Sequence, residues 1–128
     1  MSDPELYEAG LAKRRAVVGD EYVSRALENA DDFDSDWQRI LTQYCWGEVW
    51  TGSALSDRQR SLQNLCLLAA TNRQTEFETH FRGAIRNGCT RDELRETLTQ
   101  IAIYCGVPAG VEAFRIAKRV LAEQVPAA

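Results

Sequence analysis

The chain of 128 residues has a single histidine, three prolines and no apolar run near the roughly 20 residues that a membrane span requires. Its first ten residues, MSDPELYEAG, are acidic and contain no apolar stretch, so they do not resemble a secretory signal. We therefore expect a cytoplasmic protein with no membrane partner.

The chain also lacks a net positive charge, since its net charge is −4. A chain without a positive field has nothing to attract a nucleic-acid backbone, so no nucleic-acid partner is expected. The glycines are scattered singly, which excludes a glycine-rich phosphate loop. One histidine makes a metal centre improbable on composition, and we expect neither a metal nor an organic cofactor.

The four cysteines, Cys45, Cys66, Cys89 and Cys105, form no C-x-x-C pair. This spacing excludes a zinc knuckle and a dithiol redox motif of the usual kind. In a reducing compartment the favoured interpretation is four free thiols, most of them small apolar fillers.

What is present is helical periodicity over most of the chain, with no useful period-2 alternation. The pattern predicts an all-α domain over residues 1–128, with six or seven helices joined by short loops. The predicted helices run from about Pro4 to Val18, about Asp20 to Asn29, near Ser35 to the break at Thr51, Ser56 to about Ala70, Thr75 to Gly88, Thr90 to Cys105, and about Pro108 to Gln124.

Caps and apolar stripes refine these helices. Thr75 with Glu78, and Thr90 with Glu93, match the capping-box spacing. The run LQNLCLLAA is apolar nearly all round, which predicts a central buried helix and a partner chain to cover it. The predicted core stripes are Trp37, Ile40, Leu41, Tyr44 and Cys45 in the third helix, Leu94, Leu98, Ile101, Ala102 and Cys105 in the sixth, and Val111, Phe114, Ala117 and Leu121 in the last.

Two ionisable residues fall on predicted apolar stripes. His80 shares the face of Phe77 and Phe81, and Glu48 lies four residues after Tyr44. A carboxylate or imidazole on such a face is either paired within a structural network or functional. Both interpretations stay open for each residue from the pattern alone.

Arginines gather near these positions in the sequence. Arg58, Arg60, Arg73, Arg82 and Arg86 either form a solvated face or provide guanidinium groups that clamp a carboxylated small molecule. Trp46 and Trp50 flank Glu48 and either line a pocket or fill a subunit interface.

The segments YCWGEVW, YCGVPAG and NRQTEFETHFRGAIRNGCTRDELRETLTQ resemble the carboxymuconolactone decarboxylase family, and the likeness extends over residues 6–122. This family belongs to the alkylhydroperoxidase-D-like superfamily. The resemblance implies an alkylhydroperoxidase-D-like helical bundle that assembles as a homo-oligomer, typically a hexamer.

The activity implied by the resemblance is cofactor-independent decarboxylation of 4-carboxymuconolactone to β-ketoadipate enol-lactone in protocatechuate catabolism. For such a reaction the protein must bind the two carboxylates of the substrate, stabilise an oxyanion and deliver one proton to carbon. His80 is then the general acid or oxyanion donor, and Glu48 is its proton partner or orients it. The predicted substrate-binding residues are Arg73, Arg82, Arg58, Arg60 and Trp46.

Two alternatives accompany this hypothesis. A thiol peroxidase of the same superfamily would need C-x-x-C-x-x-x-H, but Arg73 and Glu76 occupy the cysteine positions, so Cys66 and Cys105 would have to meet instead. A non-catalytic binding paralogue is the other alternative. It is favoured by Tyr22, which stands where many family members have histidine.

Overall fold

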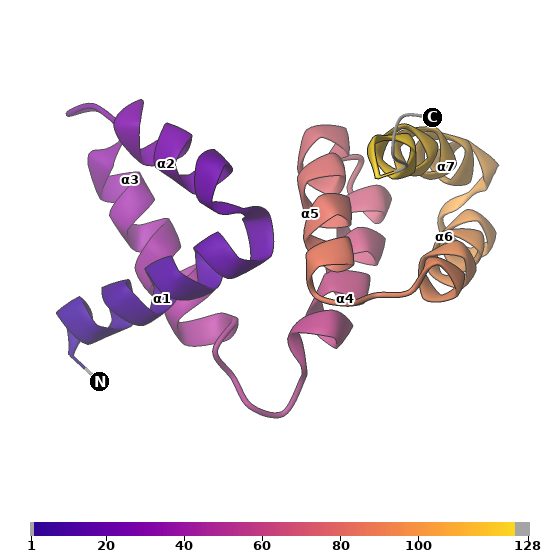
Figure 1. Cartoon of the computed structure of the whole chain (residues 1–128). Coiled ribbons are helices and arrows are strands. Elements are labelled where there is room, and N and C mark those ends of the chain that lie inside the picture. Colours follow the sequence, from indigo (N-terminus) through magenta and orange to yellow (C-terminus); the bar gives the residue numbers. More distant parts are fainter. Residues whose placement is uncertain (1, 125–128) are drawn as a thin grey trace. The chain divides into compact units, whose positions relative to one another are not determined.

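The computed structural model describes residues 2–124, and every regular element in that range is helical (Figure 1). The prediction of an all-α fold is therefore confirmed. The chain divides into two compact units, Met1–Asp57 and Arg58–Ala128, here called unit 1 and unit 2. The prediction of one domain over residues 1–128 stays a prediction.

Unit 1 contains α1 (Asp3–Val18), α2 (Asp20–Glu28), α3 (Ser35–Ile40) and the π-helical stretch η1 (Leu41–Val49). Unit 2 is built from α4 (Asp57–Ala70), α5 (Gln74–Arg86), α6 (Arg91–Cys105) and α7 (Val107–Glu123). No helix within the described part of the chain is both long enough and apolar enough to cross a membrane.

The third predicted helix continues from α3 into η1, where backbone bonds reach five residues back. The Trp50 N–H, for example, donates to the Cys45 carbonyl at 3.0 Å. The stripe predicted for this helix is largely wrong, because Trp37, Ile40, Tyr44 and Glu48 are exposed. The buried face instead contains Thr42, Gln43, Trp46, Gly47 and Trp50.

A close crossing of α1 over η1 explains which face is buried. A Cβ atom on Gly10 would lie 1.9 Å from the Thr42 carbonyl oxygen, and one on Gly47 would lie 2.4 Å from the Leu6 carbonyl oxygen. The two backbones can approach this closely only where side chains are small. Backbone contact therefore selected the face with glycine over the more apolar face.

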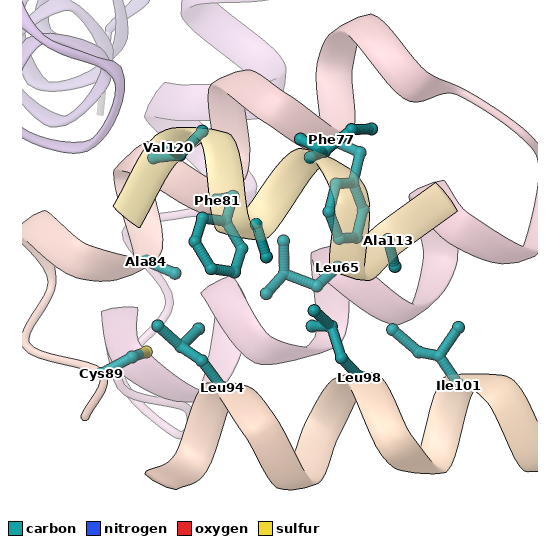
Figure 2. Close-up of a cluster of buried hydrophobic side chains, with 12 residues drawn as sticks. Leu65, Phe77, Phe81, Ala84, Cys89, Leu94, Leu98, Ile101, Ala113 and Val120 are labelled. Atoms are coloured by element: carbon teal, nitrogen blue, oxygen red, sulfur yellow. The ribbon is translucent and has the colours of Figure 1, made fainter. Parts of the chain in front are cut away.

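Unit 2 is organised around Leu65, Phe77 and Phe81, which are almost completely buried. Figure 2 shows these side chains pointing toward Leu94 and Leu98 of α6. The two phenylalanine rings lie 6.1 Å apart between centroids. Four helices thus share one apolar core, which holds the middle of α5 rigidly in place.

The predicted stripe of α6 is confirmed at Leu94, Leu98 and Ile101, but Cys105 is exposed. The stripe of α7 is confirmed only at Ala117, because the face is rotated so that Val111 is exposed while Phe114 and Leu121 are half-buried. The buried residues of α7 are Gly110, Ala113, Ile116, Ala117 and Val120.

Within the single chain, α4 is buried on one side only and not around its whole circumference. Leu65 is fully buried and Cys66 is half-buried, whereas Leu67 is 61% exposed. The other apolar residues that pack at the edge of the core are Leu62, Leu68 and Ala69. Leu67 lies on a side of α4 that the core does not reach, and its predicted cover by a partner chain stays a prediction.

Helix ends follow local signals, with one exception. Thr90 and Glu93 form the predicted capping box, and Gly88 adopts φ +88°. The box predicted at Thr75 and Glu78 is wrong. The α5 helix begins one residue earlier, after Arg73, and the Glu78 carboxylate pairs with arginines instead.

Candidate functional site

His80 lies on α5 beside the buried core of unit 2, as its spacing from Phe77 and Phe81 predicted. Its imidazole is half-buried and faces α4, where the Asn64 side-chain nitrogen is 3.4 Å from Nδ1. A second contact fixes the same pair of helices: the Asn87 amide donates to the buried Ser61 hydroxyl at 2.8 Å. Since residue numbers rise on one helix as they fall on the other, α4 and α5 run antiparallel, and this register holds His80 against Asn64.

The chemistry of the Asn64 contact determines which nitrogen of His80 carries the proton. In the orientation that the structure gives the Asn64 amide, its nitrogen is the donor and Nδ1 is the acceptor. The ring proton then resides on Nε2, on the opposite side of the ring from Asn64.

Burial lowers the pKa of His80 below its ordinary value of 6.5, while the carboxylate of Glu76 acts weakly in the opposite direction. Near neutral pH the side chain is therefore an uncharged hydrogen-bond donor.

Arg82, predicted to bind a substrate carboxylate, is already engaged. Its guanidinium pairs with Glu78 at 2.8 Å and with Glu123 at 2.8 Å, and Arg119 joins the same cluster through Glu78. Burial is partial, so such pairs are individually weak, but together they satisfy the guanidinium. In the folded chain Arg82 holds α5 to α7, and its predicted role in binding a substrate carboxylate stays a prediction.

The other three predicted arginines differ from one another. Arg58 is exposed and pairs with Glu93, the capping residue of α6. This ion pair raises the pKa of Arg58, and its predicted role in substrate binding stays a prediction. Arg60 is half-buried on α4. Arg73 is exposed at the start of α5 and lines a cavity with Phe77.

Glu48 and Trp46 belong to unit 1, whereas His80 belongs to unit 2. Glu48 is exposed, so the expectation of a carboxylate on a buried stripe is wrong, and its role as proton partner stays a prediction. Trp46 stacks on Trp50 with centroids 4.9 Å apart and packs against the valines of the unit 1 core. Its predicted contact with a substrate gains no support from this position.

Two polar residues escaped the sequence interpretation. Asn64 is the polar residue inside the apolar run LQNLCLLAA, and this interruption was the available signal. Arg14 is only 3% exposed, and its Nη1 donates to the Thr42 hydroxyl at 3.1 Å. Burial lowers its pKa. The pattern of α1 contains no signal for this burial, because the close crossing with η1 causes it.

The cysteines are free thiols, as predicted. Cys89 is buried, Cys45 and Cys66 are half-buried, and Cys105 is exposed. Burial raises the pKa of the Cys66 thiol, and the neighbouring Cys105 raises it further. A raised pKa leaves less thiolate to attack a peroxide, which weighs against the peroxidase alternative.

Comparison with known proteins identifies the family. Residues 35–119 match the model of the carboxymuconolactone decarboxylase family, and the chain belongs to that family. It is 38% identical over 120 residues to 4-carboxymuconolactone decarboxylase of Acinetobacter baylyi, a match that covers 94% of this chain and 90% of that protein. The predicted resemblance and fold family are thus confirmed.

A second relative has a different substrate in its name. Nitrosuccinic acid decarboxylase of Metarhizium robertsii is also 38% identical over 120 residues, covering 94% of this chain and 84% of that protein. A 48-residue 4-carboxymuconolactone decarboxylase sequence from Pseudomonas putida is 40% identical over its whole length, which covers 38% of this chain. The chain is accordingly a decarboxylase of this family, and these matches leave its substrate open.

Proposed function

We propose that this member of the carboxymuconolactone decarboxylase family converts 4-carboxymuconolactone to β-ketoadipate enol-lactone in protocatechuate catabolism, without a cofactor. The observation that carries the proposal is the single imidazole of His80, held by the unit 2 core and facing Asn64. Similarity to a decarboxylase of that substrate over 94% of the chain supports the choice.

The substrate supplies its own electron sink. When the carboxylate on the ring leaves as carbon dioxide, the electron pair of the broken carbon–carbon bond moves through the double bond into the lactone carbonyl. The intermediate is a furan-like dienolate with its charge on oxygen, so no external electron acceptor is required. The protein has to stabilise that oxygen and return one proton to carbon.

His80 suits the first of these tasks. Its Nε2–H is a neutral donor before the reaction, and the hydrogen bond it makes strengthens as negative charge grows on the lactone oxygen. Binding a substrate with two carboxylates would raise the pKa of the imidazole, since nearby negative charge favours the protonated form. The same ring can then supply the proton to carbon, and Glu48 is the proposed group that restores it.

The substrate carboxylates need cationic partners. The proposed ones are Arg73, Arg82, Arg58 and Arg60, of which Arg58 and Arg82 would first have to leave Glu93, or Glu78 and Glu123. Breaking an exposed pair costs at most about 1 kcal/mol. Recruitment of Arg58 or Arg82 on substrate binding is therefore energetically accessible but less direct.

The proposed enzyme is a homo-oligomer, most simply a hexamer. Ile103, Tyr104 and Val107, at the end of α6 and the start of α7, are between 71% and 81% exposed. Apolar surface of this kind in a small domain is typical of an interface. Sedimentation equilibrium tests this directly, and a fully active monomer of 14.4 kDa would contradict it.

Nitrosuccinate is the second candidate substrate, favoured by the equal identity to the nitrosuccinic acid decarboxylase. Both reactions pass through an intermediate with its negative charge on oxygen, because loss of carbon dioxide next to a nitro group leaves a nitronate. Both substrates are also dicarboxylates. The same donor and the same arginines would serve either one.

Parallel assays decide between the two substrates. Purified protein is given each compound over a range of concentrations, and carbon dioxide release is measured. We expect kcat/KM for the lactone to exceed that for nitrosuccinate by at least about tenfold, a discrimination of roughly 1.4 kcal/mol. The reverse preference makes nitrosuccinate the substrate, and no release from either compound refutes both proposals.

The role of His80 is tested in the same assay. His80→Gln should lower kcat/KM by at least about a hundredfold, the usual contribution of one acid–base group. Gln63→Leu is the matched control, because Gln63 is exposed on α4 beside Asn64. Near-normal turnover by His80→Gln would remove the imidazole from the mechanism.

A further inference from the structure

The turn between α2 and α3 combines negative charge with an exposed aromatic ring. Residues 31–36, here called the acidic turn, contain four aspartates and no basic residue. Phe33, near the centre of the turn, is 95% exposed. A phenylalanine left in water forgoes the stabilisation that burial of its ring would give. The acidic turn therefore presents an uncovered apolar ring with carboxylates on both sides.

Hydrogen bonds within the acidic turn fix its shape. The Phe33 N–H donates to the Asp31 carboxylate at 2.9 Å, and the Asp31 N–H donates to the Asp34 carboxylate at 2.8 Å. The Ser35 N–H donates to the Asp31 carbonyl at 2.9 Å. Aspartate side chains that bind nearby backbone N–H groups in this way are typical of tight turns. A group held in one position loses less entropy when it binds, so the turn suits Phe33 to docking.

A surface of opposite character lies along α6 and α7 of unit 2, which pack against each other (Figure 1). A Cβ atom on Gly110 would lie 2.4 Å from the Ala102 Cβ, so the two helices meet through small residues. Beside this contact is a hollow of about 660 Å³, and its apolar lining consists of Ala102, Val107, Gly110, Val111 and Phe114. A second hollow of about 110 Å³ adjoins it at Phe114, and the two together are here called the α6/α7 groove. Because an engineered cavity of about 150 Å³ binds benzene, the larger hollow has room for a phenylalanine ring.

The rim of the α6/α7 groove is basic. Its charged residues are Arg91, Arg95, Arg115 and Lys118. Arg95 and Arg115 form ion pairs within their own helices, at 2.8 Å with Asp92 and at 2.7 Å with Glu112. Arg91 and Lys118 are exposed, and no carboxylate among residues 2–124 pairs with either of them. The groove thus has an excess of positive charge around an apolar floor, which complements the acidic turn in both respects.

We propose that the acidic turn of one copy of this chain docks into the α6/α7 groove of a second copy. The Phe33 ring enters the larger hollow, and the aspartates face the basic rim. The apolar floor favours a protein segment with an aromatic side chain over a phosphate backbone. Each copy has one turn and one groove, so every copy can both provide and accept the contact. The inference rests on the homo-oligomer proposed above and names its two contact surfaces, whatever the number of copies or the substrate.

Sedimentation velocity from nanomolar to micromolar protein measures the dissociation constant of the assembly. Phe33→Ala should raise this constant at least about tenfold, since an aromatic side chain in a fitted hollow is typical of the residues that dominate an interface. Reversing the charge of the turn with Asp32→Lys and Asp36→Lys, or of the groove with Arg91→Glu and Lys118→Glu, should each raise it at least about tenfold, because like charges would then face each other. The matched control is Glu5→Lys with Glu8→Lys, which changes the same charge at exposed positions of α1 and should leave the constant unchanged.

Combining the two reversals in one chain completes the test. A basic turn then faces an acidic groove, so the combined variant should associate at least about tenfold more tightly than either reversal by itself. Such a recovery would not occur if the substitutions only damaged the fold. An unchanged dissociation constant in Phe33→Ala, or no recovery in the combined variant, would overturn the docking and leave the homo-oligomer standing. A monomeric wild type would overturn both, and the carbon dioxide assay judges the decarboxylation separately.

Discussion

Replacing Asn64 by aspartate should raise the pKa of His80 and favour the charged form of its imidazole. In the wild type, burial lowers this pKa below 6.5, and the amide nitrogen of Asn64 faces Nδ1 at 3.4 Å. A carboxylate oxygen in that place would accept a hydrogen bond from a protonated Nδ1. The substitution changes little in volume, so its effect on the ring is mainly electrostatic.

The size of the effect follows from this separation. Two unit charges about 4 Å apart interact by about 4 kcal/mol at an effective dielectric constant near 20. Partial exposure and the cost of burying a new carboxylate reduce this value. Opposite charges at such distances move a pKa by about one to three units, each equivalent to about 1.36 kcal/mol. The midpoint for Asn64→Asp should therefore lie above that of the wild type.

The measurement is direct because the chain has one histidine. With ¹³C-labelled histidine, the single ε1 resonance is followed by NMR between pH 5 and pH 9, and its chemical shift reports the fraction protonated. Gln63→Asp adds the same charge to an exposed position of α4 and is the matched control. It should move the midpoint far less, since an exposed charge is screened by water and salt.

Two outcomes would refute the reasoning. A wild-type midpoint at or above 6.5 would show that burial does not govern the imidazole. Equal midpoints for Asn64→Asp and Gln63→Asp would show that residue 64 does not face the ring. Asn64→Leu separates the two causes: it removes the donor, worth about 1 kcal/mol, but keeps the burial, so its midpoint should stay below 6.5.

Three further predictions follow from the same structure. If neutral His80 is the working form in the free enzyme, kcat/KM should fall as the pH drops through the lowered pKa of this residue. A pH–rate profile that instead rises toward acidic pH would identify the imidazolium form as the general acid. Stability should also fall as pH drops below 6.5, because the unfolded chain then binds a proton that the folded chain resists, and urea unfolding should show this component missing in His80→Gln. Gly10→Ala should destabilise the protein by about 1–3 kcal/mol, because the new Cβ would lie 1.9 Å from the Thr42 carbonyl oxygen. This overpacking outweighs the roughly 1 kcal/mol that alanine gains over glycine in helix propensity. Gly88→Ala is the comparison, because a Cβ at position 88 would meet no other atom and the variant loses only the roughly 1–2 kcal/mol cost of a left-handed backbone. Equal stability of Gly10→Ala and the wild type would show that α1 and η1 do not cross closely.

Much of the candidate site was predictable because its signals are periodic. His80 was placed beside Phe77 and Phe81 by spacing alone, and the structure confirms that neighbourhood. Asn64 was visible as a polar interruption in an apolar run, but its partner was not, since the contact spans 16 residues of sequence. Whether Glu48 joins His80 stays a prediction, because the two residues lie in different units.

The sequence by itself determined the helical class, the family and most helix ends. Caps such as Thr90 with Glu93, and the glycine at 88, act within a few residues, so their effect does not depend on the rest of the fold. Periodicity also marked each helix as having an apolar face. These properties are local, so residues adjacent in the sequence are enough to predict them.

Only the tertiary structure decided which face of η1 is buried and which arginines have partners. Backbone contact at Gly10 buried the Thr42 side of η1, although Tyr44 lies on the more apolar side. Arg82 is paired because Glu123 lies 41 residues away in sequence but 2.8 Å away in space, whereas Arg73 meets no such carboxylate in the described chain. Close packing and ion pairs such as Arg82–Glu123 depend on groups that come together only when the chain folds. For that reason no pattern of neighbouring residues could predict them.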